Sequence, residues 1–310
     1  MLTRFDHAVI AVRDLDGSIA AFRRLGFDTR RGGVHPGMGT ANAVIQFGLD
    51  YIELITVVDR VTGLAAGPVI QVLLDFLQQA EGFVGYGITS DDLQADAARI
   101  RRSGLAVHAM PLSRQHADGT AVRWTLGLLD GKPWLQPWPF LIQCETPDEV
   151  RLRSEPPGDH GNGACGCVGA VVGTGGELNA GRVLGEAMGL APTVDGFRAG
   201  SFALLASTEP GPPGLRELRI AVRDLRQARA ALPPSAIARA ADDQIAIDPA
   251  RTAGARIVLA RGGTRATATR ALRSSPRGML EGSPESVVGR PPEPGGESEV
   301  GQPADYVGPM

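Results

Sequence analysis

The strongest constraint on the fold of this chain is a short pattern that recurs along it. In each copy an apolar, strand-like stretch ends in an acidic residue, an amphipathic helical stretch follows, and a glycine closes the helix. In three copies the acid precedes the glycine by twelve residues: from Asp14 to Gly26, from Asp92 to Gly104 and from Glu177 to Gly189. An acidic side chain caps the free amides at a helix start, and glycine readily takes the left-handed conformation that ends a helix. The pattern therefore predicts three helices of similar length.

A fourth copy opens at residues 218–225, which nearly repeat the text of residues 10–15. Further stretches after the first two helices read as strands because they are apolar or alternating and are bounded by turn residues. These stretches are residues 40–47, 51–57, 105–110, 121–129 and 140–144. The repeated unit is thus a strand, a helix and about three strands, and four such units predict two domains.

These units set the expected domain organisation. Residues 1–150 hold units one and two, residues 151–163 form a proline-containing linker, and residues 164–262 hold units three and four. Residues 67–82 carry one apolar helical stripe and predict a packed connecting helix. Residues 263–310 are rich in glycine and proline and poor in large apolar side chains, so we expect a disordered tail.

Composition excludes several classes of partner. The net charge is −3 and the isoelectric point is near 6.0, which argues against a surface for nucleic acid or anionic membranes. No apolar run approaches the roughly 18–20 residues that a membrane helix needs, and no signal peptide precedes the first strand. No phosphate-loop or dinucleotide fingerprint stands between a strand and a helix, so we expect no nucleotide cofactor. We expect a cytoplasmic monomer or homodimer whose partner is a small molecule.

Several stretches of the chain carry a family resemblance. They are residues 5–15, 35–43, 51–55, 139–143 and 160–163. With His7 in the first strand of the unit and Glu53 in its last strand, the sequence resembles the vicinal oxygen chelate superfamily, and within it the glyoxalase-like branch.

The resemblance implies an α+β fold, in which repeated βαβββ modules pair into curled mixed sheets around a shared cleft (the glyoxalase/bleomycin-resistance/dioxygenase-like fold). In metal-using members, the first and last strands of each module present ligands, and a substrate with adjacent oxygens chelates a divalent metal such as Zn, Fe, Mn or Ni. Members include glyoxalases, ring-cleaving dioxygenases, epimerases and drug-sequestering proteins without catalysis.

The residues themselves are compatible with such a site. Alternate residues of a strand share a face, so Phe5, His7 and Val9 lie opposite the apolar face that packs on helices. By the same rule, Glu53 points into the cleft. An imidazole and a carboxylate that converge there would hold a divalent metal or act as general acid and base. A buried pair joined only by hydrogen bonds is the alternative.

The chain also departs from the family pattern. In unit two, Gly85 takes the position of His7, and the position of Glu53 falls near residues 142–143. Glycine and isoleucine cannot ligate a metal, so the first domain has two of the four expected ligands, and the second domain has no complete set. Either other side chains supply the rest, or the domain binds its ligand without a metal.

Further polar residues are candidates for the same cleft. His35, in a loop by composition, is a candidate for catalysis, and both His35 and His160 are candidates for the missing ligands. Thr40 and Asn42 alternate onto one strand face and would donate hydrogen bonds to substrate oxygens. The expected substrate-binding residues are Thr40, Asn42, Gln143, His160 and Asn162.

Three functions follow from these features. The first is a glyoxalase-like enzyme with lyase, isomerase or dioxygenase chemistry on a small oxygenated metabolite, with or without a divalent metal. The second is a protein of the same fold that binds or sequesters a small molecule without catalysis. The third is a structural or regulatory pair of domains whose tail recruits partners.

Overall fold

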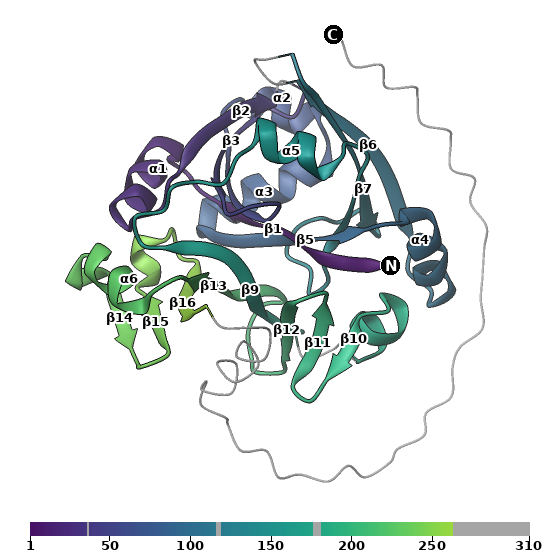
Figure 1. Cartoon of the computed structure of the whole chain (residues 1–310). Coiled ribbons are helices and arrows are strands. Elements are labelled where there is room, and N and C mark those ends of the chain that lie inside the picture. Colours follow the sequence, from purple (N-terminus) through teal and green to yellow (C-terminus); the bar gives the residue numbers. More distant parts are fainter. Residues whose placement is uncertain (36, 116–118, 176–180, 263–310) are drawn as a thin grey trace.

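The computed structural model describes residues 1–35, 37–115, 119–175 and 181–262, and within them two eight-stranded sheets (Figure 1). The strands of the first sheet are β1 (Leu2–Ala11), β2 (Arg30–His35), β3 (Thr40–Gln46), β4 (Tyr51–Val57), β5 (Gly82–Ser90), β6 (Val107–Gln115), β7 (Ala121–Leu129) and β8 (Phe140–Cys144). They run in the order β2-β3-β4-β1-β5-β8-β7-β6. The strands expected from the sequence in this region are therefore confirmed.

Two βαβββ modules meet in the middle of this sheet. β1 pairs in parallel with β4 and antiparallel with β5, while β5 pairs in parallel with β8. The described helices of this half are α1 (Leu15–Arg24), α2 (Arg60–Ala65), α3 (Pro68–Gln79), α4 (Leu93–Arg102) and α5 (Asp148–Ser154). Helices α1 and α4 each follow the first strand of a module, as the repeated pattern predicts.

The acid and the glycine of the pattern do what their chemistry predicts. Asp14 accepts a hydrogen bond from the amide of Gly17 at the start of α1, and Asp92 accepts one from the amide of Ala95 at the start of α4. Beyond the ends of these helices, Gly26 takes φ +82° and Gly104 takes φ +89°, a conformation that other residues adopt only with strain. Glu177 and the expected disordered tail lie outside the described residues.

The second sheet has the same order of strands, β10-β11-β12-β9-β13-β16-β15-β14. Its strands are β9 (Ala164–Gly173), β10 (Ala191–Thr193), β11 (Gly196–Ala199), β12 (Phe202–Ser207), β13 (Gly214–Val222), β14 (Ile237–Ala240), β15 (Gln244–Ile247) and β16 (Arg256–Arg261). Its described helical segments are the π-helical η1 (Gly181–Ala187), α6 (Leu225–Ala231) and the short 3₁₀ turns η2 (Pro234–Ala236) and η3 (Pro249–Arg251). The curled mixed-sheet fold expected from the sequence is confirmed.

The two faces of β1 bury different sets of side chains. Ala8, Ile10 and Val12 pack in one apolar cluster with residues of α1 and of the second sheet. On the other face, Val9 and Ala11 pack in a second cluster with Leu73 and Leu77 of α3. Helix α3 lies within the curl of the first sheet in Figure 1, so it fills part of the hollow. The expected packed connecting helix is confirmed.

Phe5 breaks the alternation expected for β1. The register with β5 shifts between Phe5 and His7, which is a β-bulge. Phe5 consequently packs with Ala8 in the first cluster and stacks on Phe202 of the second sheet at a centroid distance of 4.3 Å. The expectation that Phe5 shares the face of His7 is wrong, because the bulge inserts an extra residue into the alternation.

The segment after β8 is closely tied to the first sheet. It begins with α5, and the 150/151 boundary expected from the sequence falls inside this helix. Beyond α5, the amide of Gly158 donates to the carbonyl of Gln46, and the side chain of Asn162 donates to the carbonyl of Leu25. Among the described residues, no helix has the length and apolarity needed to span a bilayer.

Replacing either ring of the pair Phe5–Phe202 by alanine should lower the free energy of unfolding by about 3–5 kcal/mol, because each ring is buried and closely packed. The double variant should lose about 0.5–1.5 kcal/mol less than the sum of the single losses, because the ring contact is lost only once. Urea unfolding followed by circular dichroism measures these values. Strictly additive losses would show that the two sheets do not dock through these rings.

Candidate functional site

A cavity of about 660 Å³ opens on the concave side of the first sheet. Most of its wall is apolar and comes from both modules, including Leu112, Trp124, Leu126, Leu128, Trp134 and Phe140. Polar side chains gather on β1, β3 and β4, with further ones on β6 and α5. A cavity of this kind, mostly apolar with a few convergent polar groups, is the usual form of a small-molecule site.

His7 stands at the polar end of this cavity and is held by its neighbour in the chain. The ring nitrogen Nδ1 of His7 lies 2.9 Å from Oδ1 of Asp6. Both side chains line the cavity and are buried. Because an ionised carboxylate can only accept, Nδ1 carries the proton of the neutral ring, and Nε2 is left with its lone pair. The bulge in β1 makes this contact between adjacent residues, which a regular strand would point to opposite faces.

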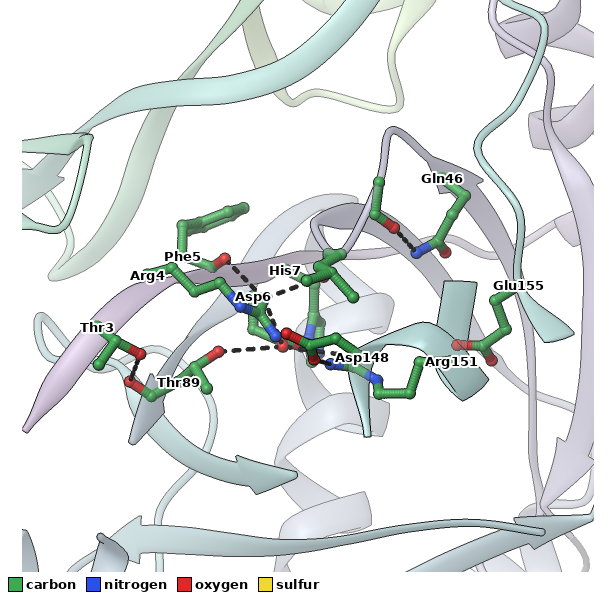
Figure 2. Close-up of polar contacts among 12 residues, drawn as sticks. Thr3, Arg4, Phe5, Asp6, His7, Gln46, Thr89, Asp148, Arg151 and Glu155 are labelled. Carbon is green, nitrogen blue, oxygen red and sulfur yellow. Dashed lines mark hydrogen bonds and ion pairs between the residues drawn. The ribbon is translucent and has the colours of Figure 1, made fainter. Parts of the chain in front are cut away.

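Asp6 is fully buried and surrounded by donors, as Figure 2 shows. Arg4 donates to Oδ2 of Asp6 over 3.2 Å, the hydroxyl of Thr89 donates over 3.3 Å, and Arg151 approaches to 3.7 Å. Burial by itself raises the pKa of Asp6. The hydrogen bond from His7, the charge of its ring whenever it is protonated, and the charges of Arg151 and Arg4 outweigh burial and bring this pKa below its ordinary value. Asp6 therefore stays ionised beside His7.

Glu53 faces His7 across the sheet. Its Oε2 lies 3.8 Å from Nε2 of His7, and its Oε1 accepts a hydrogen bond of 2.6 Å from the amide of Asn42. The other end of Asn42 accepts from the backbone of Gly33 over 2.9 Å, which fixes the orientation of its amide. The structure thus brings together His7, Glu53 and Asn42 on three adjacent strands.

His35 and Thr40 lie at the rim of the same cavity. Nδ1 of His35 and the hydroxyl of Thr40 are 2.8 Å apart and hydrogen-bonded to each other. His35 was expected in a loop, but it is the last residue of β2 and pairs with Thr40 across the β2–β3 hairpin. The expectation of a loop is wrong because backbone pairing with β3 extends β2 up to the turn.

Tyr51 adds an aromatic platform beneath the imidazole. The rings of Tyr51 and His7 are stacked, with centroids 4.4 Å apart and planes 15° from parallel. Burial, together with the charges of Asp6 and Glu53, raises the pKa of Tyr51 well above its ordinary value. Its hydroxyl therefore remains a proton donor over the physiological range.

Three of the expected substrate-binding residues do not line the cavity. Gln143 accepts a hydrogen bond from the amide of Leu93 at the start of α4. His160 bridges two strand ends, since its Nδ1 accepts from the amide of Asp28 and its Nε2 contacts the carbonyl of Gln46. The side-chain oxygen of Asn162 accepts from the amide of Ala164. These polar groups hold local backbone in place.

The donor set does not fit the four-ligand metal site that the family pattern implies. By strand register, Val9 lies opposite Glu53 just as Gly87 lies opposite Phe140, so Phe140 takes the position of Glu53 in the second module. The prediction that residues 142–143 take this position is wrong, because the length of the loop before β8 shifts the register from the one that counting along the sequence gives. At Gly85, the counterpart of His7, an added Cβ would lie 2.8 Å from the carbonyl oxygen of Pro133.

Aromatic and backbone groups therefore occupy the half of the cavity where two more ligands would stand. Among the described residues, no group of three or more histidine, cysteine, aspartate or glutamate side chains is placed to hold a metal. The amide of Asn42 does not complete the set either, because its oxygen, the atom that could bind a metal, accepts from the backbone of Gly33, and its NH2 group faces Glu53.

Several polar residues of this cavity were not predicted as site residues, among them Asp6, Arg151 and Tyr51. Asp6 was missed because strict alternation sends it to the face opposite His7. Arg151 was missed because its segment reads as a linker between domains. Tyr51 follows the turn before β4 and shares the strand face of Glu53. This shared face is the sequence signal that could have identified Tyr51 as a cavity residue.

A sequence profile of the family described as "Glyoxalase-like domain" matches residues 5–179, more than half of the chain. The chain therefore belongs to this family, and the resemblance to the glyoxalase-like branch of the vicinal oxygen chelate superfamily is confirmed. Among curated proteins, none matches the sequence at a significant level.

Solved structures share the fold at low sequence identity. A hypothetical protein from Staphylococcus aureus superposes with a TM-score of 0.61 and 16% identity, covering 84% of this chain and 100% of its own. The Mn(II)-bound glyoxalase from Novosphingobium aromaticivorans gives a TM-score of 0.51 and 10% identity, covering 83% and 82%. The 2,3-dioxygenase LapB from Pseudomonas sp. KL28 gives 0.51 and 13%, covering 84% and 93%. At such identities the likeness establishes the fold alone.

Stability should depend on pH through His160. Burial lowers the pKa of His160 below its ordinary value of 6.5. The unfolded chain therefore binds a proton here as the pH falls through about 6.5, while the folded chain resists, so the free energy of unfolding declines on acidification. His160→Gln should flatten this decline between about pH 7.5 and 5 in urea unfolding. An unchanged slope, equal to that of the exposed control His108→Gln, would contradict the prediction.

Proposed function

We propose that this protein is a glyoxalase-like enzyme of the lyase or isomerase type, in which His7 moves a proton on a small oxygenated substrate. The observation that carries the proposal is the line from Asp6 through His7 to Glu53. A buried carboxylate orients the imidazole, and the free Nε2 faces a second carboxyl group 3.8 Å away, beside the cavity. An imidazole oriented in this way can act as a general base through the lone pair of Nε2.

The cavity supports a substrate with an apolar body and one oxygenated end. Its volume of about 660 Å³ falls within the range of small-molecule sites, and its far walls are tryptophan, phenylalanine and leucine. The polar end offers His7, Glu53 and the phenol of Tyr51. If a substrate carbonyl lies there, His7 can act as a base on the carbon beside it, and the phenol of Tyr51 can donate a hydrogen bond to its oxygen.

The proposed step is proton transfer next to that carbonyl. Nε2 of His7 takes a proton from the carbon beside the carbonyl, and the electron pair of the broken bond moves to the carbonyl oxygen as an enolate. The protonated phenol of Tyr51 donates to the enolate oxygen, while the carboxylate of Asp6 stabilises the imidazolium. Return of this proton from the imidazolium of His7 to the carbon it left restores the carbonyl, with exchange of the hydrogen. In a hydroxyketone, its return to the former carbonyl carbon, while the hydroxyl proton of the substrate passes from one substrate oxygen to the other, completes an isomerisation.

Solvent-proton exchange tests this step with 2-hydroxyacetophenone, an uncharged aryl hydroxyketone, as the probe. The protein should catalyse exchange of the hydrogens beside the carbonyl into deuterated water, followed by proton NMR. His7→Ala should lower the rate by at least about 100-fold because the base is removed, and Asp6→Asn should lower it less. His108→Ala, which removes an exposed histidine outside the cavity, should leave the rate unchanged. Equal rates in His7→Ala and the parent would contradict the proposal.

Metal removal should leave this exchange in place. Because the donor set of the cavity lacks two of the four expected ligands, dialysis against EDTA should not lower the His7-dependent rate, and elemental analysis should find well under one metal per chain. A metal content that falls in both His7→Ala and Glu53→Gln would instead show that these two residues hold a divalent ion.

Binding without catalysis is the second candidate function, and the apolar character of the cavity favours it. A sequestering protein needs an enclosed apolar volume and few polar groups, which the walls from β6 and β7 provide. Tight binding of aryl compounds with no proton exchange on any hydroxyketone would favour this function over the first.

A further inference from the structure

Arg151 is the one arginine of α5 that is buried. Its side chain lines the cavity, and the residue is 7% exposed, whereas Arg153 on the same helix is exposed. Figure 2 shows it reaching from α5 toward Asp6 on β1. Burying a guanidinium costs desolvation free energy, which its hydrogen-bond partners must offset. These partners therefore indicate the role of the side chain.

The guanidinium of Arg151 is incompletely satisfied. Its Nη2 lies 3.7 Å from Asp6 and its Nη1 lies 3.8 Å from Asp148, and both distances exceed those of a hydrogen bond. Nη1 is buried and has no hydrogen-bond partner among the residues that the structure describes. Arg4, His7 and Thr89 already donate hydrogen bonds to Asp6, so Asp6 does not need a further hydrogen bond from Arg151.

We propose that Arg151 binds a carboxylate group of the substrate, and that the substrate is accordingly a small carboxylic acid with an apolar body. A guanidinium offers parallel N–H donors that match the two oxygens of a carboxylate. Asp6 lies between Arg151 and the ring of His7, at 3.7 Å from the former and 2.9 Å from the latter. A carboxylate on Arg151 would therefore bind at the same end of the cavity as His7.

The charges around Arg151 favour a monoanion. Two carboxyl groups, those of Asp6 and Asp148, lie within 4 Å of the guanidinium, and Glu53 faces the same cavity. A phosphate carrying two negative charges would be repelled by these groups, whereas a carboxylate brings a single negative charge to the guanidinium. The choice of a carboxylic acid over a phosphate ester therefore rests on the local balance of charge.

This inference rests on the cavity of the proposed function and adds the chemical class of its substrate. Its test is a binding measurement and needs no turnover. The probes are phenylacetate, its uncharged counterpart phenylacetamide, and phenyl phosphate, measured by isothermal titration calorimetry on the full chain. Phenylacetate should bind the unmodified protein at least about tenfold more tightly than either of the other two, because only it fits the free donor with one charge.

Two substitutions on α5 form a matched pair. Arg151→Gln should weaken phenylacetate binding by about 10- to 100-fold and leave phenylacetamide binding nearly unchanged. Arg153→Gln removes the same charge from the exposed side of the helix and should change neither. Arg151→Lys, which keeps the charge without the paired donors, should recover part of the lost affinity.

The comparison of probes on the unmodified protein keeps the inference falsifiable even where Arg151→Gln does not fold. Equal affinities for phenylacetate and phenylacetamide, or tighter binding of phenyl phosphate, would overturn it. Selective binding without proton exchange would refute the proposed function alone, and exchange without selective binding would refute this inference alone.

Discussion

A buried carboxylate in the central strand organises the first half of this protein. Asp6 cannot lie ionised in the interior without several donors, because an unpaired buried charge would cost a large part of the small net stability of the fold. Its hydrogen-bond donors come from β1 and β5, and the charge of Arg151 on α5 lies 3.7 Å away. The same group therefore links both modules to the covering helix and sets the orientation of the imidazole that faces the cavity.

Much of the fold could be predicted from the sequence because its rules are local. Asp14 and Asp92 cap helices through contacts three residues away, and Gly26 and Gly104 end them through their own backbone freedom. The hairpins and apolar runs of the first half are likewise defined within a few residues. The π-helical form of η1 and the β-bulge after Phe5 depend on neighbouring strands and helices, and no local pattern predicts them.

The site was predictable only where side chains follow regular strands. His7, Glu53, Thr40 and Asn42 line the cavity as alternation suggests. Gln143, His160 and Asn162 have the same kinds of polar group, but backbone groups that the chain brings near them only on folding take their hydrogen bonds. The place of Arg151 in the cavity could not be predicted, because its segment must first fold back over the first sheet. That return depends on long-range packing.

Helix α5 lies near the middle of the chain, after all eight strands of the first sheet, and adds Arg151 to the wall of the cavity that these strands form. During synthesis, a chain that has completed both modules but not this helix would present the apolar hollow to its surroundings. Such a nascent species carries a large adhesive surface and depends on rapid completion of the next few turns or on chaperones. The order in which the chain emerges thus makes the last element of the first half the one that protects it from aggregation.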